Sequence, residues 1–322
     1  MANQPILTVT LNPALDVTTS VGRLQPRHKL RCSAPRYDAG GGGANVSRAI
    51  KLLGGTSCAF VALAGAMGHQ YRDILVAAGI DSEIWESDGE TRFSLTVMED
   101  ASGEHFRFVL PGPAFEPGQA ETLLGKLAAT IASGYRFVVA SGSLPPGLPQ
   151  DYYGKVARLT REAGAAFVVD AAGPALAATF AERPYLVRLN HREAQELIGG
   201  DNSEEAAHKL TEDLIERRVA EVVVVTVGDQ GAIVAAERTR LRIHPPRVQV
   251  KSSVGAGDSF VGALVLGLAK GWPLEDACRF GVAAAASAVT TPATELCERA
   301  ATERYFREIS GSTQEVDRLL QA

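Results

Sequence analysis

The sequence predicts an α/β fold with a doubly wound, mostly parallel sheet and a small additional β-sheet. Six short apolar runs recur along the chain with helical segments between them. They are ILTVTL (Ile6 to Leu11), CAFVALAG (Cys58 to Gly65), FVVASG (Phe137 to Gly142), AFVVDA (Ala166 to Ala171), YLVRLN (Tyr185 to Asn190) and EVVVVTVG (Glu221 to Gly228). Runs that are apolar throughout are typical of strands covered on both faces, and helical intervals between such strands indicate βαβ crossovers.

Two segments break this rhythm and predict the small sheet. Val17 to Ala39 is polar and irregular, whereas Thr91 to Gly112 alternates around a Ser-Gly turn, as in a hairpin. We expect them to form a lid, at about residues 14–38 and about 90–112, within a single domain of residues 1–322. One face of such a sheet would lack cover, which predicts a homodimer formed through the lid.

Composition favours small molecules as partners. Lys plus Arg number 32 and Asp plus Glu 37, giving a net charge of −5, so neither nucleic acid nor an anionic membrane is expected to bind. No apolar run approaches the roughly 20 residues that cross a bilayer. The opening MANQPILTVTLNP lacks a basic stretch followed by a long apolar one, so we expect no signal peptide.

The cysteines indicate a reducing compartment. Cys32, Cys58, Cys278 and Cys297 show neither C-x-x-C spacing nor clustering. This spacing argues against a zinc site and against a disulfide framework. Reduced thiols in the cytoplasm fit the pattern best.

Polar residues follow the predicted strands at the points where ligands bind in such sheets. Asn12 and Asp16 come after the first run, Ser141 lies near the end of the third, Asn190 ends the fifth and Gly228 ends the sixth. Ligands of doubly wound sheets lie beyond the carboxyl ends of the strands. We therefore expect these residues to share one site.

A run of four glycines precedes a predicted amphipathic helix in DAGGGGANVSRAIKLLGG, Asp38 to Gly55. Bare backbone at a helix start allows a ligand to approach closely, although a flexible turn would also explain it. The stretch lacks the G-K-[ST] ending of a Walker loop. It also lacks the G-x-G-x-x-G pattern of a dinucleotide-binding loop. The loop is still compatible with a hydroxyl-rich ligand, because Asn45 can both donate and accept hydrogen bonds.

The stretch VGAGDSFVGALVLGLA, Val254 to Ala269, places three small residues before an acid and an apolar helix. Asp258 could be the N-cap of that helix. Alternatively, the amides of Gly255, Ala256 and Gly257 could cradle an anion, with Asp258 beside them as a base. In that interpretation Asp258 takes the proton of a hydroxyl that attacks a phosphoryl group. The two roles are compatible.

Two further patterns concern ions. Asn190 and Glu193 have N-x-x-E spacing, which suits Mg²⁺ held through water, although a capping box explains the same spacing and is favoured by these residues alone. Lys29, Arg31, Arg92 and Arg107 lie in the lid segments. Basic side chains of this kind are usually solvated surface charges. Because these four gather in the segments expected to cover the site, they indicate a phosphate on the substrate.

These motifs resemble the ribokinase-like sugar kinases of the PfkB family over nearly the whole chain. GGGGANVSRAIKLLGG is similar to the first signature of the family, VGAGDSFVGA to the second, and NHRE to its N-x-x-E magnesium motif. VTLNPALD, KLRCSAP, ASGEHFRFVLPG and SGSLPPG are most similar to the minor, PfkB-type 6-phosphofructokinase branch. The 1-phosphofructokinases and tagatose-6-phosphate kinases are sister branches.

The resemblance implies a role for each matched residue. Asp258 would be the catalytic base, and Gly255, Ala256 and Gly257 its anion hole. The sugar hydroxyls would be held by Asp16, Gly40, Gly41, Gly42, Asn45 and Ser141, and the sugar phosphate by Lys29, Arg92 and, across a dimer interface, Arg31. The ATP site would include Arg188, Asn190, Thr226, Gly228 and Gly231, with Asn190 and Glu193 for Mg²⁺.

The sequence departs from the family pattern at three places. Arg188-Leu189-Asn190 stands where K-P-N is common, and TRFSL replaces T-R-Q-N-L, so Phe93 is expected to alter the grip on the sugar. The N-x-G-x-R pattern that encloses a monovalent cation in similar kinases is missing, with Pro292 and Glu295 in that segment. Potassium (K⁺) activation is therefore not expected, although Ser252 and Val254 could supply oxygens.

The resemblance implies ATP-dependent, Mg²⁺-requiring phosphorylation of the C1 hydroxyl of fructose 6-phosphate to fructose 1,6-bisphosphate. Tagatose 6-phosphate and fructose 1-phosphate differ from that substrate by one configuration or one position, and the sequence does not rank them. A catalytically silent sugar-phosphate sensor is a different class of function that the same fold permits. The intact GAGD argues against a sensor, which has no use for a base.

Overall fold

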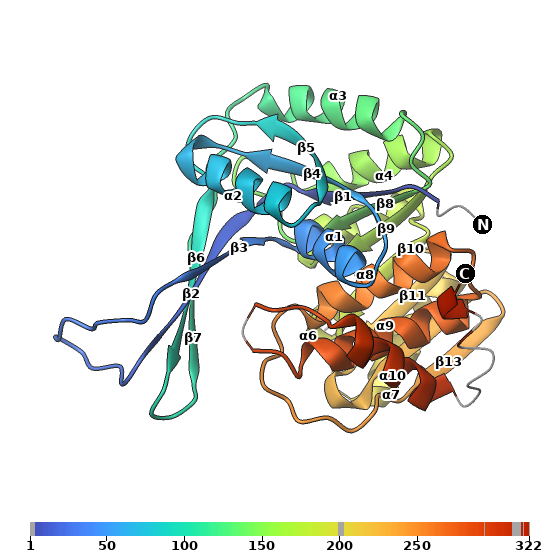
Figure 1. Cartoon of the computed structure of the whole chain (residues 1–322). Helices are drawn as coiled ribbons and strands as arrows, with labels where there is room; N and C mark the ends of the chain where they lie inside the picture. The colour runs from blue at the N-terminus through green and yellow to red at the C-terminus, as the bar shows by residue number, and fades with distance from the viewer. Residues whose placement is uncertain (1–3, 199–202, 293, 311–316, 318, 322) are drawn as a thin grey trace.

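The larger of two sheets has nine strands in the order β13-β12-β11-β10-β9-β8-β1-β4-β5 (Figure 1). The computed structural model describes residues 4–198, 203–292, 294–310, 317 and 319–321. Strands β11 through β5 in that order pair in parallel, while β12 and β13 form an antiparallel extension. The strands are β1 (Ile6–Thr10), β4 (Cys58–Leu63), β5 (Asp81–Glu86), β8 (Phe137–Ser141), β9 (Ala166–Asp170), β10 (Leu186–Asn190), β11 (Val222–Thr226), β12 (Ala232–Ala236) and β13 (Thr239–Ile243).

The six predicted strands are all present, as β1, β4, β8, β9, β10 and β11. Strands β5, β12 and β13 were not predicted. The polar TVGDQGA segment forms the turn between β11 and β12, with a short 3₁₀ helix at Gly228–Gln230. The segment therefore forms a hairpin between β11 and β12.

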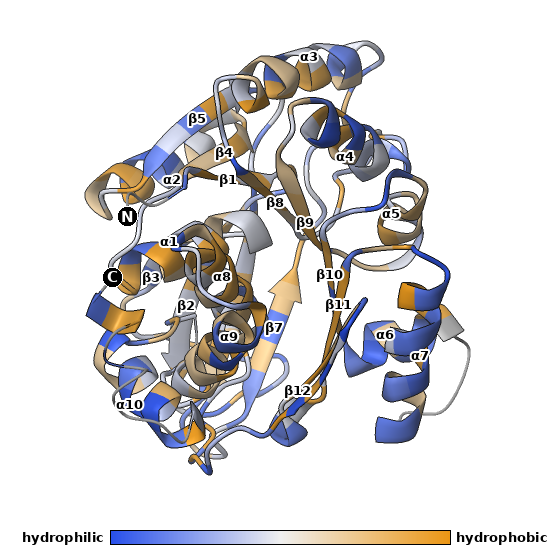
Figure 2. Ribbon diagram, turned by 90° about the vertical axis from the view of Figure 1, so that its right-hand side faces the viewer, coloured by the Kyte–Doolittle hydropathy of each residue, from blue (hydrophilic) through white to orange (hydrophobic). Residues whose placement is uncertain are grey.

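Helices cover both faces of the large sheet, so the doubly wound, mostly parallel prediction is confirmed. One face carries α1 (Gly42–Leu52), α8 (Ala256–Ala269), α9 (Leu274–Ala288) and α10 (Arg299–Ser310), and α2 (Gly65–Ala77) packs near the β4 edge. The other carries α3 (Gln119–Ile131), α4 (Tyr152–Glu162), α5 (Gly173–Ala177), α6 (His191–Ile198) and α7 (Glu204–Glu216). Figure 2 shows α8, α9 and α10 on one side of the strands and α4 to α7 on the other.

The strands are apolar throughout because each supplies two cores. In β11, Val222 and Val224 belong to the core under α8 and α9, whereas Val223 and Val225 belong to the core under α4 and α7. Alternate residues of a strand point to opposite faces. A strand between two helical layers therefore needs apolar residues at every position.

Helix α8 is apolar on all sides because it lies between α1 and α9. Every residue from Ser259 to Ala269 is buried. Gly262 lets the backbones of α1 and α8 approach, since a Cβ there would lie 2.9 Å from the Cβ of Ala49. No helix in the described ranges is both long enough and apolar enough to span a bilayer.

The smaller sheet has the strand order β3-β2-β6-β7 and extends away from the main body (Figure 1). Its strands are β2 (Ala14–Val21), β3 (Arg36–Gly40), β6 (Arg92–Glu99) and β7 (His105–Val109). Strands β6 and β7 pair antiparallel around the predicted Ser-Gly turn. These strands fall in the two segments that break the strand rhythm of the sequence.

The two faces of the smaller sheet differ in chemistry. Pairing aligns Tyr37, Val17, Leu95 and Phe108 in one row across the four strands. The neighbouring row, Asp38, Asp16, Ser94 and Val109, points to the opposite face, because side chains alternate along a strand. The first face exposes apolar side chains, with 43% of Tyr37 and 52% of Phe108 accessible.

We predict that Leu264→Ala lowers the free energy of unfolding by about 3 kcal/mol, because it removes a side chain that is wholly enclosed by α1, α9 and the sheet. Leu52→Ala is the matched control, since Leu52 is 49% exposed at the end of α1. The control should change stability by less than about 0.5 kcal/mol in urea denaturation. Equal losses in both variants would contradict the assignment of α8 to the core.

Candidate active site

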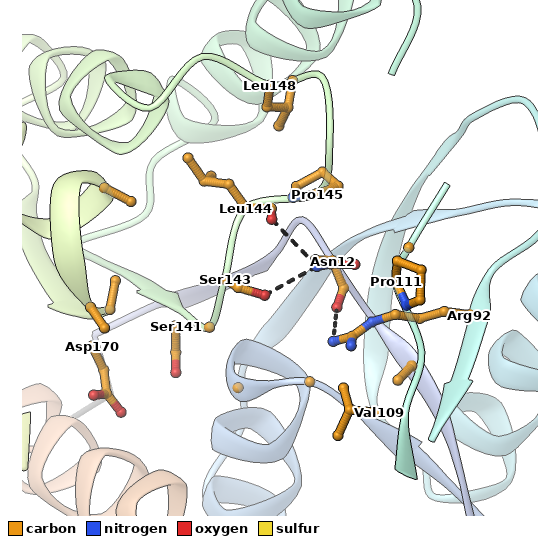
Figure 3. A pocket seen from close by; sticks show the side chains of 18 of the residues that line it. Asn12, Arg92, Val109, Pro111, Ser141, Ser143, Leu144, Pro145, Leu148 and Asp170 are labelled. Carbon is orange, nitrogen blue, oxygen red and sulfur yellow. Dashed lines mark hydrogen bonds between the residues drawn. The ribbon is translucent and has the colours of Figure 1, made fainter. Parts of the chain in front are cut away.

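A cavity of about 760 Å³ opens where the carboxyl edge of the large sheet meets the smaller sheet. Asp170 and Ser141 lie on one wall, Arg92 and Val109 lie on the other, and Asn12 lies between them (Figure 3). Its polar lining residues are Asn12, Asp16, Asn45, Arg92, Ser94, Arg107, Ser141, Ser143, Gln150, Asp170, Arg188, Glu193 and Asp258. The rule that ligands bind beyond the strand ends therefore gives the correct edge.

Asp258 lies in this cavity, in the first turn of α8. The N-cap is Gly255, and no side chain caps the helix, so the prediction of Asp258 as N-cap is wrong. Gly255 has φ 76°, and a Cβ there would collide with Leu296. Because glycine reaches this left-handed conformation without strain, the helix begins at Ala256, two residues before Asp258.

The backbone before Asp258 presents N–H groups at the positive end of α8. In the described chain, the amides of Gly255 and Gly257 have no hydrogen-bond partner, and that of Ala256 reaches only the carbonyl of Ser253 at 3.5 Å. A Cβ on Gly257 would lie 2.9 Å from Nη1 of Arg188. A guanidinium therefore stands beside these amides, and both favour an anion.

The electrostatic surroundings of Asp258 suit a group that exchanges protons near neutral pH. Burial, assisted by the charge of Asp170, raises the pKa of Asp258 to about 6. The hydrogen bond from Nδ2 of Asn45 to Oδ2 of Asp258, 2.9 Å long, opposes this rise, as do Arg188 and Arg48. Asp258 is thus mostly ionised at pH 7 and close to its pKa.

Arg188 and Asp170 form a buried ion pair at the ends of β10 and β9, with 3.1 Å between Nη1 and Oδ1. Nη2 of Arg188 also donates to Oγ1 of Thr226 at 2.6 Å. Burial opposes the charge of Arg188, but Asp170, with smaller help from Glu193 and Asp258, outweighs it, and the pKa of Arg188 is raised. Asp170 was not among the predicted site residues, although it ends strand β9 as Asn190 ends β10.

The glycine run packs tightly against polar side chains of the cavity. A Cβ on Gly40 would collide with the carboxylate of Asp16, and one on Gly42 with Oγ of Ser141. Burial raises the pKa of Asp16 to about 6, against the lowering effect of Arg107. In the described chain this carboxylate has no hydrogen-bond partner, so it can accept bonds from a ligand.

The cations of the smaller sheet divide into two groups. Arg92 and Arg107 line the cavity, and Arg92 donates to the carbonyls of Asn12, Pro13 and Leu110. Sequence reasoning grouped Arg107 with the cations of the lid but did not place it among the ligand residues. Lys29 and Arg31 lie exposed in the loop between β2 and β3, outside the cavity of this chain.

Phe93 does not reach the cavity, contrary to expectation. It pairs with Leu15, so it points to the apolar face of the smaller sheet. Ser94, the next residue, lines the cavity instead. The alternation of side chains along β6 decides which of the two can touch a ligand.

Asn190 and Glu193 form a capping box at the start of α6. Oε2 of Glu193 accepts from the Asn190 amide at 2.7 Å, and Oδ1 of Asn190 accepts from the Glu193 amide at 2.9 Å. Glu193 also lines the cavity, and burial raises its pKa. Within the described residues, no group of three or more His, Cys, Asp or Glu could hold a metal.

The remaining predicted residues lie outside the lining of the cavity. For the sugar this is Gly40, and for the phosphoryl group they are Gly255, Ala256 and Gly257, which directly precede Asp258. For the nucleotide they are Asn190, Thr226, Gly228 and Gly231, and for potassium Ser252 and Val254. Asn190 and Thr226 are paired across β10 and β11, so they share the carboxyl edge with Arg188. The candidate nucleotide residues therefore flank the cavity on the β11 side.

The chain is similar to characterised kinases along its length. It is 41% identical over 316 residues to the ATP-dependent 6-phosphofructokinase isozyme 2 of Mycobacterium tuberculosis, covering 97% of this chain and 91% of the relative. It is 36% identical over 307 residues to the enzyme of the same name in Escherichia coli, covering 95% and 99%.

A solved structure extends the similarity to the fold. The phosphofructokinase-2 of Escherichia coli in complex with fructose-6-phosphate superimposes with a TM-score of 0.89 at 35% identity, covering 95% of this chain and 99% of the other. The model of the pfkB family carbohydrate kinases matches residues 10–301. The chain, with its ribokinase-like fold, is therefore a member of the pfkB family of carbohydrate kinases and a sugar phosphotransferase.

Proposed function

We propose that the protein transfers the terminal phosphoryl group of ATP to the C1 hydroxyl of fructose 6-phosphate, in the cytoplasm, giving fructose 1,6-bisphosphate. The observation that carries this proposal is the position of Asp258, in a cavity beside unpaired amides at the start of α8. The names of the relatives and the cations of the smaller sheet support a substrate that already bears phosphate.

Asp258 is the proposed general base. Asn45 occupies its Oδ2, which leaves Oδ1 to take the proton of the attacking hydroxyl. A pKa of about 6 keeps the carboxylate ionised at neutral pH without making it too weak a base. Asp16 and Ser141, at the glycine run, are proposed to orient the other hydroxyls of the sugar together with Asn45 and the backbone of Gly40 to Gly42.

The charge of the transferred phosphoryl group is proposed to meet the amides of Gly255, Ala256 and Gly257 and the guanidinium of Arg188. The residues also fit Mg²⁺, since Glu193 offers carboxylate oxygen in the cavity and Mg²⁺ usually keeps waters and phosphate oxygens as its other ligands. Asn190 acts indirectly here, because its amide oxygen holds the Glu193 backbone. Bound Mg²⁺ would neutralise charge on the phosphates of ATP.

The sugar phosphate is proposed to bind Arg92 and Arg107 on the wall formed by the smaller sheet, which thereby serves as a lid on a single domain. The nucleotide is proposed to lie along the β10 and β11 edge, near Thr226, Gly228 and Gly231. Ser252 and Val254 lie outside the cavity, and Glu295 is paired with Arg36 at 2.6 Å. Potassium is not included in the proposed reaction, although Ser252 and Val254 still offer oxygens for it.

We also propose a homodimer formed through the apolar face of the smaller sheet. The row Tyr37, Val17, Leu95 and Phe108 is open to solvent at both ends. A second copy supplies a face of matching shape and apolar character, and an apolar sheet face of this kind needs cover. In such a dimer, Lys29 and Arg31 of one copy are proposed to reach the sugar phosphate in the other.

We predict that, in an assay of ADP release over a panel of sugar phosphates, fructose 6-phosphate gives the highest kcat/KM. Tagatose 6-phosphate and fructose 1-phosphate, the alternative substrates, should be lower, and unphosphorylated fructose lower still because it lacks the group that Arg92 and Arg107 would bind. A higher kcat/KM for either alternative would replace the proposed substrate. Binding of sugar phosphate without any ADP release would indicate a sensor instead.

We predict that Asp258→Asn lowers kcat by about a thousandfold, because the amide cannot accept the proton. Calorimetric binding of fructose 6-phosphate should change by less than about fivefold, since the variant keeps the shape of the side chain. Asp213→Asn is the matched control, because it removes one carboxylate of a surface pair with Arg217. Near-normal turnover by Asp258→Asn would exclude this residue as the base.

We predict that Phe108→Asp converts the protein from dimer to monomer, because a charge buried in an apolar interface loses its hydration. Light scattering after size-exclusion chromatography measures the mass directly. Val76→Asp is the control, since Val76 is 67% exposed on α2, apart from the smaller sheet. A monomeric wild-type protein at micromolar concentration would refute the proposed dimer.

A further inference from the structure

We propose that Arg48 is a positioning residue that fixes the amide of Asn45 and, through it, the carboxylate of Asp258. The proposal rests on the proposed role of Asp258 as base. Arg48 itself does not line the cavity, so its effect on the reaction is indirect. It stands on α1, three residues after Asn45, and therefore on the same side of the helix.

Hydrogen-bond chemistry allows only one orientation of the Asn45 amide. Nη1 of Arg48 lies 2.9 Å from Oδ1 of Asn45, and Nδ2 of Asn45 lies 2.9 Å from Oδ2 of Asp258. A guanidinium can only donate, and an ionised carboxylate can only accept. The amide oxygen must therefore face Arg48, which directs the NH₂ group toward Asp258.

Arg48 is held in turn by a carboxylate of the smaller sheet. Nη2 of Arg48 donates to Oδ1 of Asp38 at 2.9 Å, and the two side chains are only 16% and 14% exposed. The other oxygen of Asp38 accepts from Nε of Arg36 at 2.9 Å and from Oγ1 of Thr294 at 2.7 Å. Both oxygens of Asp38 are thus occupied, and Nη1 of Arg48 also reaches the carbonyl of Ala39 at 3.5 Å, so the guanidinium is held from two sides.

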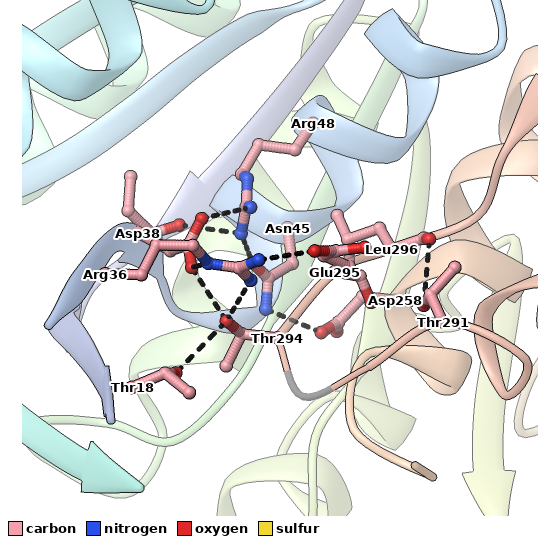
Figure 4. Close-up of polar contacts among 11 residues, drawn as sticks. Thr18, Arg36, Asp38, Asn45, Arg48, Asp258, Thr291, Thr294, Glu295 and Leu296 are labelled. Carbon is pink, nitrogen blue, oxygen red and sulfur yellow. Dashed lines mark hydrogen bonds and ion pairs between the residues drawn. The ribbon is translucent and has the colours of Figure 1, made fainter. Parts of the chain in front are cut away.

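The outer end of this chain joins the smaller sheet to the segment before α10. Arg36 forms an ion pair with Glu295 at 2.6 Å and donates to Thr294 at 2.8 Å (Figure 4). The sequence of contacts is therefore Glu295, Arg36, Asp38, Arg48, Asn45 and Asp258. It links β3, α1 and α8, so the orientation of the base depends on β3 lying against α1.

The charged groups around Asp258 are few, and Arg48 is one of them. Asp170 on β9 raises the pKa of Asp258, whereas Arg188 on β10 and Arg48 on α1 lower it. Removing Arg48 therefore raises that pKa further, by loss of its positive charge. Because the ionised form is the active one, the acid limb of kcat would move to higher pH.

The test is a double-mutant cycle of Arg48→Met and Asn45→Ala, with kcat measured at saturating ATP and fructose 6-phosphate. Arg48→Met alone should lower kcat about tenfold, with both KM values within twofold and the acid limb moved upward. In the Asn45→Ala background, the same change should lower kcat less than about twofold, because the amide through which Arg48 acts is absent. A merely structural role would give multiplicative losses.

Two control variants separate the outcomes. Arg279→Met also removes an arginine paired with two carboxylates, on α9 away from the cavity, and should leave kcat unchanged. Asp38→Asn should lower kcat about threefold, in the same direction as Arg48→Met, and serves if that variant fails to fold. Multiplicative losses in the cycle, or a change in KM alone, would overturn the proposal. An inactive wild-type protein would instead overturn the proposed function.

Discussion

Parallel pairing of the central strands is the constraint on which the candidate site depends. Ser141 pairs with Asp170, Asp170 with Arg188, and Asn190 with Thr226, each across two adjacent strands. Because parallel strands end at the same edge, polar residues that are distant in sequence emerge side by side. The cavity exists because α8 begins at this edge, and Gly255 sets that start.

The site retains charges that the fold alone does not need. Asp170 and Arg188 are buried and Asp258 is partly buried; burial raises the pKa of Asp258, and the carboxylates around Arg188 raise its pKa. Burying such groups seldom adds stability, because lost hydration cancels most of the attraction between them. Their presence together is what the proposed transfer of a phosphoryl group requires. Asn45 and Arg48 then appear as the groups that keep the carboxylate directed.

The sequence predicted the class of the large sheet and six of its nine strands, but not the other three. Apolar runs predicted β1, β4 and β8 to β11, because strands buried on both faces carry an unmistakable pattern. Strand β5 is partly exposed and carries charges, and β13 is likewise partly exposed, so neither shows that pattern. The hairpin of β6 and β7 was predictable from its turn, and the doubly wound class followed from the helical intervals.

The candidate site was predictable in its centre and less so at its margins. Motif residues such as Asp16, Asn45, Ser141 and Asp258 do line the cavity. Asp170 and Arg107 line the cavity but were not predicted as ligand residues. A single acid at the end of a strand, or a single arginine in a hairpin, forms no motif with its neighbours in the sequence. The cap was misplaced because a sequence does not reveal that Gly255 adopts a positive φ and starts the helix early. Phe93 was misplaced because face assignment needs the strand register.

The strand register of the smaller sheet also determines which sequence changes this sheet tolerates. Within β6, residues that face the cavity alternate strictly with residues that face outward, as Arg92, Phe93, Ser94 and Leu95 show. One residue inserted into β6 would exchange the two sets of side chains. Arg92 would then lie on the apolar face and Phe93 in the cavity. In homologues, the strands of this sheet should therefore differ by substitutions at constant length. Insertions and deletions should be found in the turns between the strands.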